Sequence, residues 1–239
     1  MDPFAYRLVS SLARAVAAAR HGRALHPAGR TFTATLDPLP GAPRLGVPAL
    51  DGPAGRPVVV RLSRALSLPP PLPDGLGLAL RIPGGGDPGD LDLLFTTGGR
   101  PPAPPWLPYP VLDFAAGFYS TLLPYRSRLG RVRLLAVPVD RRRRLSGDPG
   151  RVAAVPAAVP AGAAPAGPLE FVLGLDGAVR APLARLRLHG PVPPGEEVAA
   201  FDPIRNAHPG LRPTGAVQRA RAAAYAGSQQ GRSAAGRKG

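Results

Sequence analysis

The most chemically suggestive residues lie near the C-terminus, where Arg221 precedes Tyr225 by four positions. We predict a basic helix there, and on a helix this spacing puts both side chains on one face. A guanidinium beside a phenol favours the phenolate and lowers the tyrosine pKa from its ordinary value of about 10. A tyrosinate is one of the few protein ligands that hold haem iron through oxygen. Taken alone, such a pair is more often a surface Arg–Tyr contact on a basic helix.

Several other chemistries lack the residues that they need. The chain has no cysteine, which excludes disulfides, zinc–thiolate sites, iron–sulfur clusters and cysteine nucleophiles. We expect no zinc site, because no His-x-x-x-His pair lies on a helix among His21, His26, His189 and His208. No uncharged apolar run reaches the roughly 18 residues that cross a membrane. We therefore expect a cytoplasmic protein without a membrane span.

The elements that must position these residues are mostly strands. Short apolar or alternating runs are bounded by Gly, Pro and Asp, a pattern typical of strands in a meander or barrel. The runs are Arg30–Leu36, Pro57–Leu62, Gly77–Ile82, Asp90–Thr96, Arg131–Val139, Leu169–Leu175 and Ala178–His189.

Helices are predicted at both ends and in the middle of the chain. Apolar residues recur every four positions over residues 3–20, and a short helix is expected at 111–122. The order of elements favours the α+β class, with an antiparallel β-barrel of about eight strands and surrounding helices. We expect a single domain over residues 1–239. It would contain an Arg/Ala/Pro/Gly-rich loop at 140–168 and a flexible basic tail at 233–239.

Four short blocks follow one another in the order of a known family. They are Arg23–Gly29, Val58–Ser63, Asp74–Leu94 and Pro182–Tyr225. The first looks like an Arg-x-x-His-Ala-x-Gly segment and the second like a Val-Arg-Phe-Ser strand. The third is similar to Asp-x-x-Gly-x-Ala followed by Asp-Leu-Val, and the fourth contains Phe201-Asp202-Pro203 before Arg221-x-x-x-Tyr225. In this order and spacing, roughly residues 20–97 and 180–232 resemble the haem-containing core of the catalase family.

The resemblance implies a haem b cofactor whose iron is held by Tyr225, with Arg221 favouring the phenolate. His26 would be the distal histidine, which moves a proton between the two peroxide oxygens. Ser63 would hydrogen-bond to His26 and fix its tautomer. The remaining cofactor-binding residues would be Arg23, Arg61 and Arg232, which neutralise haem propionates or add to the field around the phenolate.

The chain also departs from the family. It is much shorter than catalases, and its only asparagine is Asn206. Aligning Asp92-Leu93-Leu94 puts Thr96 and Thr97 where the family carries its distal asparagine. We assign Thr97 as the substitute hydrogen-bond partner of peroxide. A distal histidine with threonine resembles the catalase-related allene oxide synthases, so rearrangement of a lipid hydroperoxide is an alternative.

Charge offers a different hypothesis. The formal net charge is +15, and Lys238 is the only lysine among 30 cationic side chains. A charge of +15 is typical of proteins that bind nucleic acid or an anionic membrane. With so much Ala, Gly and Pro it is better explained by a GC-rich bacterial genome, so we do not expect nucleic acid as a partner. We expect a peroxidase-like or weakly catalase-like enzyme, acting on hydrogen peroxide or an organic hydroperoxide with a small organic reductant. Its rivals are a non-enzymatic haem-binding or sensing protein and a haem-free basic protein that binds nucleic acid.

Overall fold

The computed structural model describes residues 28–98, 107–142, 145–153, 169–193, 195–198 and 200–214. Within these ranges the two helices are short, α2 (Pro48–Asp51) and α3 (Pro149–Ala153). The strands are β1 (Ala28–Pro38), β2 (Arg56–Arg64), β3 (Leu76–Ile82), β4 (Leu91–Thr97), β5 (Tyr119–Ser120), β6 (Tyr125–Ser127), β7 (Gly130–Pro138), β8 (Glu170–Gly177), β9 (Ala181–Pro191) and β10 (Leu211–Pro213).

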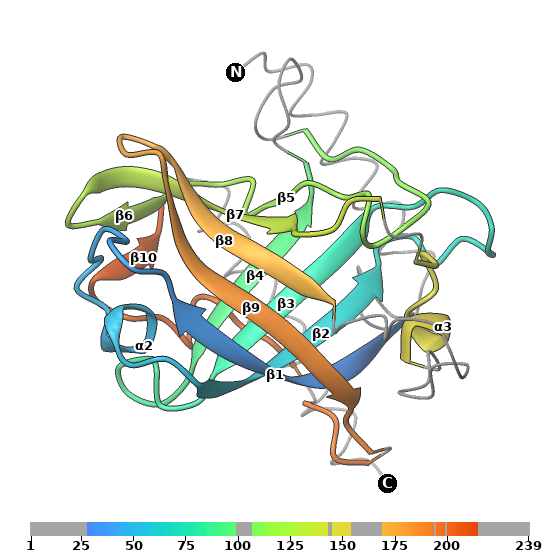
Figure 1. The fold of residues 1–239 in the computed structure, drawn as a ribbon, viewed down its shortest axis with the longest axis horizontal. Helices are drawn as coiled ribbons and strands as arrows, with labels where there is room; N and C mark the ends of the chain where they lie inside the picture. Colours follow the sequence, from blue (N-terminus) through green and yellow to red (C-terminus); the bar gives the residue numbers. More distant parts are fainter. Residues whose placement is uncertain are drawn as a thin grey trace, which may run out of the picture.

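Eight of the strands close into an antiparallel barrel (Figure 1). The hydrogen-bonded order is β10-β6-β7-β5-β4-β3-β2-β1-β9-β8, and an additional pairing of β7 with β8 closes the ring. Strands β6 and β10 extend the sheet beyond β7 as a short ribbon. Closure gives every barrel strand a neighbour on both sides, although β5 contributes only two residues, which pair with Thr96 and Thr97 of β4 and with Leu135 and Ala136 of β7.

Strict alternation of side chains explains why these segments form a barrel. Successive side chains point to opposite faces of a strand, and along β2 the inward residues Val58, Val60 and Leu62 are buried. The interior is filled by residues at matching positions of the neighbouring strands: Phe32, Ala34, Leu36, Leu78, Leu80, Ile82, Leu91, Leu93, Phe95, Leu134, Phe171, Leu173 and Leu186. The same alternation leaves Arg61 and Ser63 of β2 on the outer face.

One end of the barrel is closed by a buried ion pair. Arg64, the last residue of β2, lies 3.5 Å from the Asp74 carboxylate, measured from Nε to Oδ2. Its Nη1 donates to the Gly147 carbonyl oxygen at 2.8 Å and its Nη2 to that of Leu72 at 2.9 Å. These contacts fasten the segments before β3 and α3 to the end of β2.

The seven strands that the sequence predicts are all confirmed. The helix predicted at 111–122 is wrong, because Tyr119 and Ser120 form β5 between β4 and β7. The Asp113 carboxylate turns the chain just before it by accepting a hydrogen bond from the Ala115 amide at 2.6 Å.

The sequence analysis predicts helices around the barrel, but the described part of the chain does not support them, since it contains only the short helices α2 and α3. The predicted terminal helices lie outside the described residues, and α2 and α3 lie near opposite ends of the barrel in Figure 1. Helix α3 falls within the segment predicted as a loop at 140–168. Within the described ranges, no helix combines the length and the apolar character that crossing a membrane requires.

Candidate functional site

The candidate site is the outer face of β1–β4. Cross-strand partners form two rows: Gly29, Ser63, Gly77 and Thr96, and next to it Thr31, Arg61, Ala79 and Leu94. We call these eight residues the outer face. Most of them are small, because glycine, alanine, serine and threonine occupy six of the eight positions. A sheet surface of this kind accepts a flat group at close range.

Arg61 supplies the cation of the outer face. A Cβ atom at position 29 would lie 2.5 Å from Arg61 Cζ and 2.6 Å from Arg61 Nη2. The guanidinium therefore lies across β1 directly over Gly29, and any side chain at position 29 would displace it. Glycine at this position leaves the space that the guanidinium occupies, and the register partner of Gly29 is Ser63.

Two hydroxyl groups of the outer face are buried. Ser63 is 4% exposed and Thr31 is fully buried. The Thr31 Oγ1 atom has no hydrogen-bond partner among the described residues. A buried hydroxyl without a partner carries a desolvation cost of about 1–3 kcal/mol, so this atom marks a place where a polar ligand atom would be stabilised.

Thr97, the predicted partner of peroxide, lies on the opposite side of the sheet. It is fully buried, and its Oγ1 donates to the Tyr109 carbonyl oxygen at 2.6 Å and accepts from the Leu76 amide at 3.2 Å. Both bonds hold the end of β4 in place. The structure therefore does not bring Thr97 together with Ser63 and Arg61.

Thr96 is the threonine that lies on the outer face. Its register partner is Gly77, which in turn pairs with Ser63, so the two hydroxyl residues flank one glycine on the same face. Its Oγ1 donates to the Leu76 carbonyl oxygen at 3.3 Å. The sequence analysis named Thr96 but assigned the role to Thr97. The inward positions of Leu91, Leu93 and Phe95 are the signal that distinguishes them.

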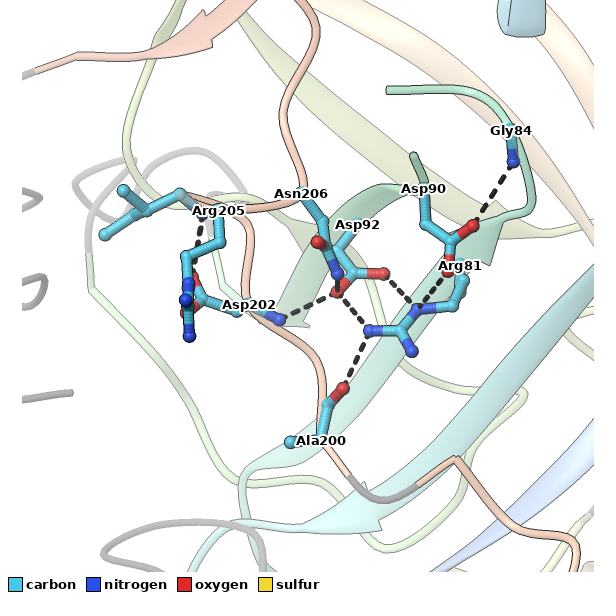
Figure 2. Close-up of polar contacts among 9 residues, drawn as sticks. Arg81, Gly84, Asp90, Asp92, Ala200, Asp202, Arg205 and Asn206 are labelled. Carbon is cyan, nitrogen blue, oxygen red and sulfur yellow. Dashed lines mark hydrogen bonds and ion pairs between the residues drawn. The ribbon is translucent and has the colours of Figure 1, made fainter. Parts of the chain in front are cut away.

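The opposite end of the same sheet face is covered by residues 200–206, as Figure 2 shows. Asp92 of β4 is fully buried and binds Arg81 of β3 through two hydrogen bonds, from Nε at 2.7 Å and from Nη2 at 2.6 Å. The hydrogen bond with Asp92 raises the pKa of the Arg81 guanidinium, so this cation stays charged. The pair forms the barrel's half of a clasp.

Residues 200–206 supply the other half. Asp92 Oδ2 also accepts hydrogen bonds from the Asp202 amide at 2.7 Å and from Asn206 Nδ2 at 2.8 Å. Arg81 Nη2 donates to the Ala200 carbonyl oxygen at 2.7 Å, and its guanidinium lies 5.0 Å from the centre of the Phe201 ring. We call this arrangement the Arg81–Asp92 clasp. It fixes the path of the chain that leads to the C-terminus.

Five of the predicted site residues lie outside the described residues: Arg23, His26, Arg221, Tyr225 and Arg232. Their roles stay predictions. His26 precedes Ala28, the first residue of β1, by two positions, and Tyr225 follows the last described residue, Thr214, by eleven.

The described residues of the outer face fit a flat, anionic group such as haem. The small residues on neighbouring strands project little from the sheet, so a flat group could approach the backbone closely. Arg61 supplies a cation for a carboxylate, and Thr31 offers an unpartnered hydroxyl. A guanidinium is the preferred partner of a carboxylate because its fork matches the two oxygens.

Comparison with solved structures identifies the barrel. Catalase A from Saccharomyces cerevisiae is similar with a TM-score of 0.59 over 93% of this chain, at 12% sequence identity. The chain has the fold of a catalase core. A fungal catalase is similar with a TM-score of 0.56 over 90% of this chain, at 11% identity. No family model matches the sequence, and no curated protein matches it.

The chain spans 63% and 60% of the lengths of these two catalases. The fold-level part of the sequence resemblance is therefore confirmed as an eight-stranded antiparallel β-barrel. At such low identity the likeness concerns the fold alone, and membership of the family, with any subtype, stays a prediction.

Proposed function

We propose that this protein is a haem-dependent enzyme that reacts with hydroperoxides, through peroxidase-like or weak catalase-like turnover. The observation that carries the proposal is the outer face of a catalase-type barrel, where Arg61, Ser63 and Thr96 lie together beside the unpartnered Thr31 hydroxyl. One face of the barrel therefore combines a guanidinium, three hydroxyls and two glycines.

Residues of this chain would hold haem b as follows. Tyr225 would bind the iron, and Arg221 would favour its phenolate form because a nearby cation lowers the tyrosine pKa. Arg61 would pair with a propionate, and Arg23 and Arg232 are the further candidates for that role. Bound haem would supply a redox-active iron at which the O–O bond of a hydroperoxide can be cleaved.

The proton transfer would depend on His26, with Ser63 and Thr96 as its supports. Because two residues span at most about 7 Å of extended chain, the connection to Ala28 limits how far His26 can lie from the Ser63 end of the outer face. A histidine with an ordinary pKa near 6.5 can accept the proton of a hydroperoxide and return it to the other oxygen. Ser63 would orient the imidazole. Thr96, rather than Thr97, would contact the bound peroxide, and its one O–H would turn from the Leu76 carbonyl oxygen to donate to the peroxide.

Titration of the purified full chain with haemin tests the proposal. We expect saturable binding and a high-spin ferric spectrum of the tyrosinate type, and Tyr225→Phe should abolish that spectrum. Tyr109→Phe is the matched control, because Tyr109 contacts Phe118 at the edge of the barrel and should leave haem binding intact. A wild-type chain that binds no haemin, or a Tyr225→Phe variant with an unchanged spectrum, would refute the proposal.

Stopped-flow reaction of the haem-loaded protein with peroxide tests the hydroxyl assignment. Thr96→Val should slow the reaction about tenfold, the effect of losing roughly one hydrogen bond to the reacting group. Thr33→Val is the control, since Thr33 is an exposed threonine of β1 whose hydroxyl donates to the Gly190 carbonyl oxygen. Equal rates in the parent and the Thr96 variant would remove Thr96 from the mechanism.

Rearrangement of a lipid hydroperoxide is a second candidate because a threonine, not an asparagine, lies on the outer face. A hydroxyl donates one hydrogen bond and reaches less far than an amide. A second molecule of hydrogen peroxide would then be held poorly, whereas one bulky hydroperoxide would still react. Product analysis with hydrogen peroxide and with a fatty-acid hydroperoxide separates the two candidates.

A further inference from the structure

Three arginines form a row across the ribbon of β10, β6 and β7. Arg212 pairs in register with Arg126, and Arg126 pairs in register with Arg131. All three side chains are exposed. Directly opposed residues of neighbouring strands point to the same face, so the three guanidinium groups project together. We call these residues the arginine row.

The arginine row lacks the carboxylate partners that six other strand arginines have. Those six lie within 4.0 Å of a carboxylate on another strand or segment: Arg30–Glu197, Arg64–Asp74, Arg81–Asp92, Arg133–Asp176, Arg185–Glu170 and Arg187–Asp37. Among the described residues, no carboxylate lies within 4.0 Å of Arg126, Arg131 or Arg212. Like charges directly opposite each other destabilise a sheet. The row is therefore an unfavourable arrangement that an anion would relieve.

The ribbon holds the row in place. On its other face Tyr125, Val132 and Leu211 are buried, so the backbone is anchored to the core. Thr214 fastens β10 to β6, because both its amide and its Oγ1 donate to the Pro124 carbonyl oxygen, at 3.0 and 2.8 Å. The ribbon thus fixes the spacing of the three backbone positions from which the arginine side chains project, so that only the side chains must be ordered when a ligand binds.

Spacing and surroundings indicate the chemistry of the ligand. Three adjacent strands span two inter-strand distances, about 10 Å in all, which is comparable to the length of a triphosphate chain. Guanidinium groups match phosphate oxygens bidentately. The aromatic residue of the ribbon, Tyr125, is buried, so this face offers no described ring on which a nucleic-acid base would stack.

We propose that Arg126, Arg131 and Arg212 form a binding site for a linear chain of phosphates, the triphosphate of a nucleotide or a segment of inorganic polyphosphate. The site lies on β6, β7 and β10, whereas the outer face lies on β1–β4, so the two sites share no residue. Figure 1 shows β6 and β10 at the end of the barrel where α2 lies, away from α3.

Calorimetric titration of the full chain with tripolyphosphate at low ionic strength tests the site. The variant Arg126→Gln/Arg131→Gln/Arg212→Gln should bind about tenfold more weakly, because three exposed charge pairs are lost together. The control Arg44→Gln/Arg151→Gln/Arg180→Gln also removes three positive charges, but from scattered exposed positions outside the row, and should bind tripolyphosphate like the parent. The row variant should unfold at the parent temperature or higher, since it loses only mutual repulsion.

Further ligands distinguish the sources of the phosphates. If ATP binds as tightly as tripolyphosphate and AMP binds much more weakly, the site accepts the triphosphate of a nucleotide. If ATP binds much more weakly than tripolyphosphate, the ligand is inorganic polyphosphate. Equal weakening in the row variant and the control would overturn the proposal, because net charge would then explain binding. A DNA duplex that binds through the row while tripolyphosphate binds no better than single phosphate would also overturn it, in favour of a nucleic-acid contact.

Discussion

Tyr119 shows how a single polar atom is accommodated in the apolar barrel. The side chain is fully buried, and its ring meets that of Phe171 edge to face, with 5.7 Å between centroids. Its hydroxyl donates to the Phe114 carbonyl oxygen at 2.9 Å. Burial, reinforced by the negative charge of Asp113, raises the pKa of the Tyr119 phenol well above its ordinary value. The phenol therefore stays neutral wherever the barrel is folded.

This shift predicts a loss of stability in alkali. A raised folded-state pKa favours the protonated form, so the contribution is complete below the unfolded pKa of about 10 and declines as the pH rises above it. Thermal unfolding followed from pH 8 to 11.5 should show the melting temperature falling above pH 10. Tyr119→Phe should lower stability at pH 8 by about 1 kcal/mol, through the lost hydrogen bond, and flatten the alkaline decline. The same alkaline slope in both proteins would contradict the account.

At the scale of elements, the Arg81–Asp92 clasp joins parts of the chain that are far apart in sequence. The Asp92 carboxylate accepts four hydrogen bonds, two from Arg81, one from the Asp202 amide and one from Asn206. The Asp202 carboxylate in turn accepts from the amides of Ile204 and Arg205 at 3.0 and 3.2 Å. The last described segment is thus fastened to β3 and β4 beside the outer face.

Asp92→Asn should therefore destabilise the protein strongly. Removing one partner of a buried, hydrogen-bonded ion pair typically costs about 3–5 kcal/mol, so a value near 3 kcal/mol is expected in urea unfolding. Asp90→Asn is the control, because this carboxylate is 38% exposed and lies 3.6 Å from Arg81. An exposed pair contributes less than about 1 kcal/mol. Similar losses in the two variants would mean that the clasp stabilises the fold no more than a surface contact does.

The elements also show what the sequence could predict. Seven strands follow from the alternation of apolar residues, which the closed barrel requires of every long strand. The short strands β5, β6 and β10 contain two or three residues, too few for any periodicity. Tyr119 illustrates the consequence. It falls within the helix expected at 111–122, whereas its pairing with Thr97 and Ala136 makes it a strand residue.

The same limit applies to the candidate site. The sequence analysis placed Arg61 and Ser63 two positions apart on one strand, and in the structure both lie on the outer face. To choose between Thr96 and Thr97, one must know which residues of β4 point into the barrel. Phe95 and its register partner Leu78 are buried there, so Thr97 points inward and Thr96 outward. Thr31 was missed, because an unpartnered hydroxyl is a property of packing that no residue pattern records.

For the whole molecule, the barrel separates stability from the proposed chemistry. The core fills the interior of the ring, and the candidate haem face lies on its outside, so the two share no side chain. Closure through β7 and β8 makes every barrel strand depend on its neighbours rather than on a cofactor.

The haem-free protein should therefore remain folded. Tyr225→Phe, purified without haem, should keep the parent's far-ultraviolet circular dichroism and unfold cooperatively, with the barrel amides of β2–β4 protected from hydrogen exchange. Haem should stabilise the parent only as a ligand that binds the folded state. At a free haem concentration 100 times its dissociation constant, the free energy of unfolding should rise by about 2.7 kcal/mol, and the melting temperature should rise with it. Loss of amide protection in β1–β4 of the haem-free protein would show that the outer face, and not the interior alone, is required to hold the barrel together.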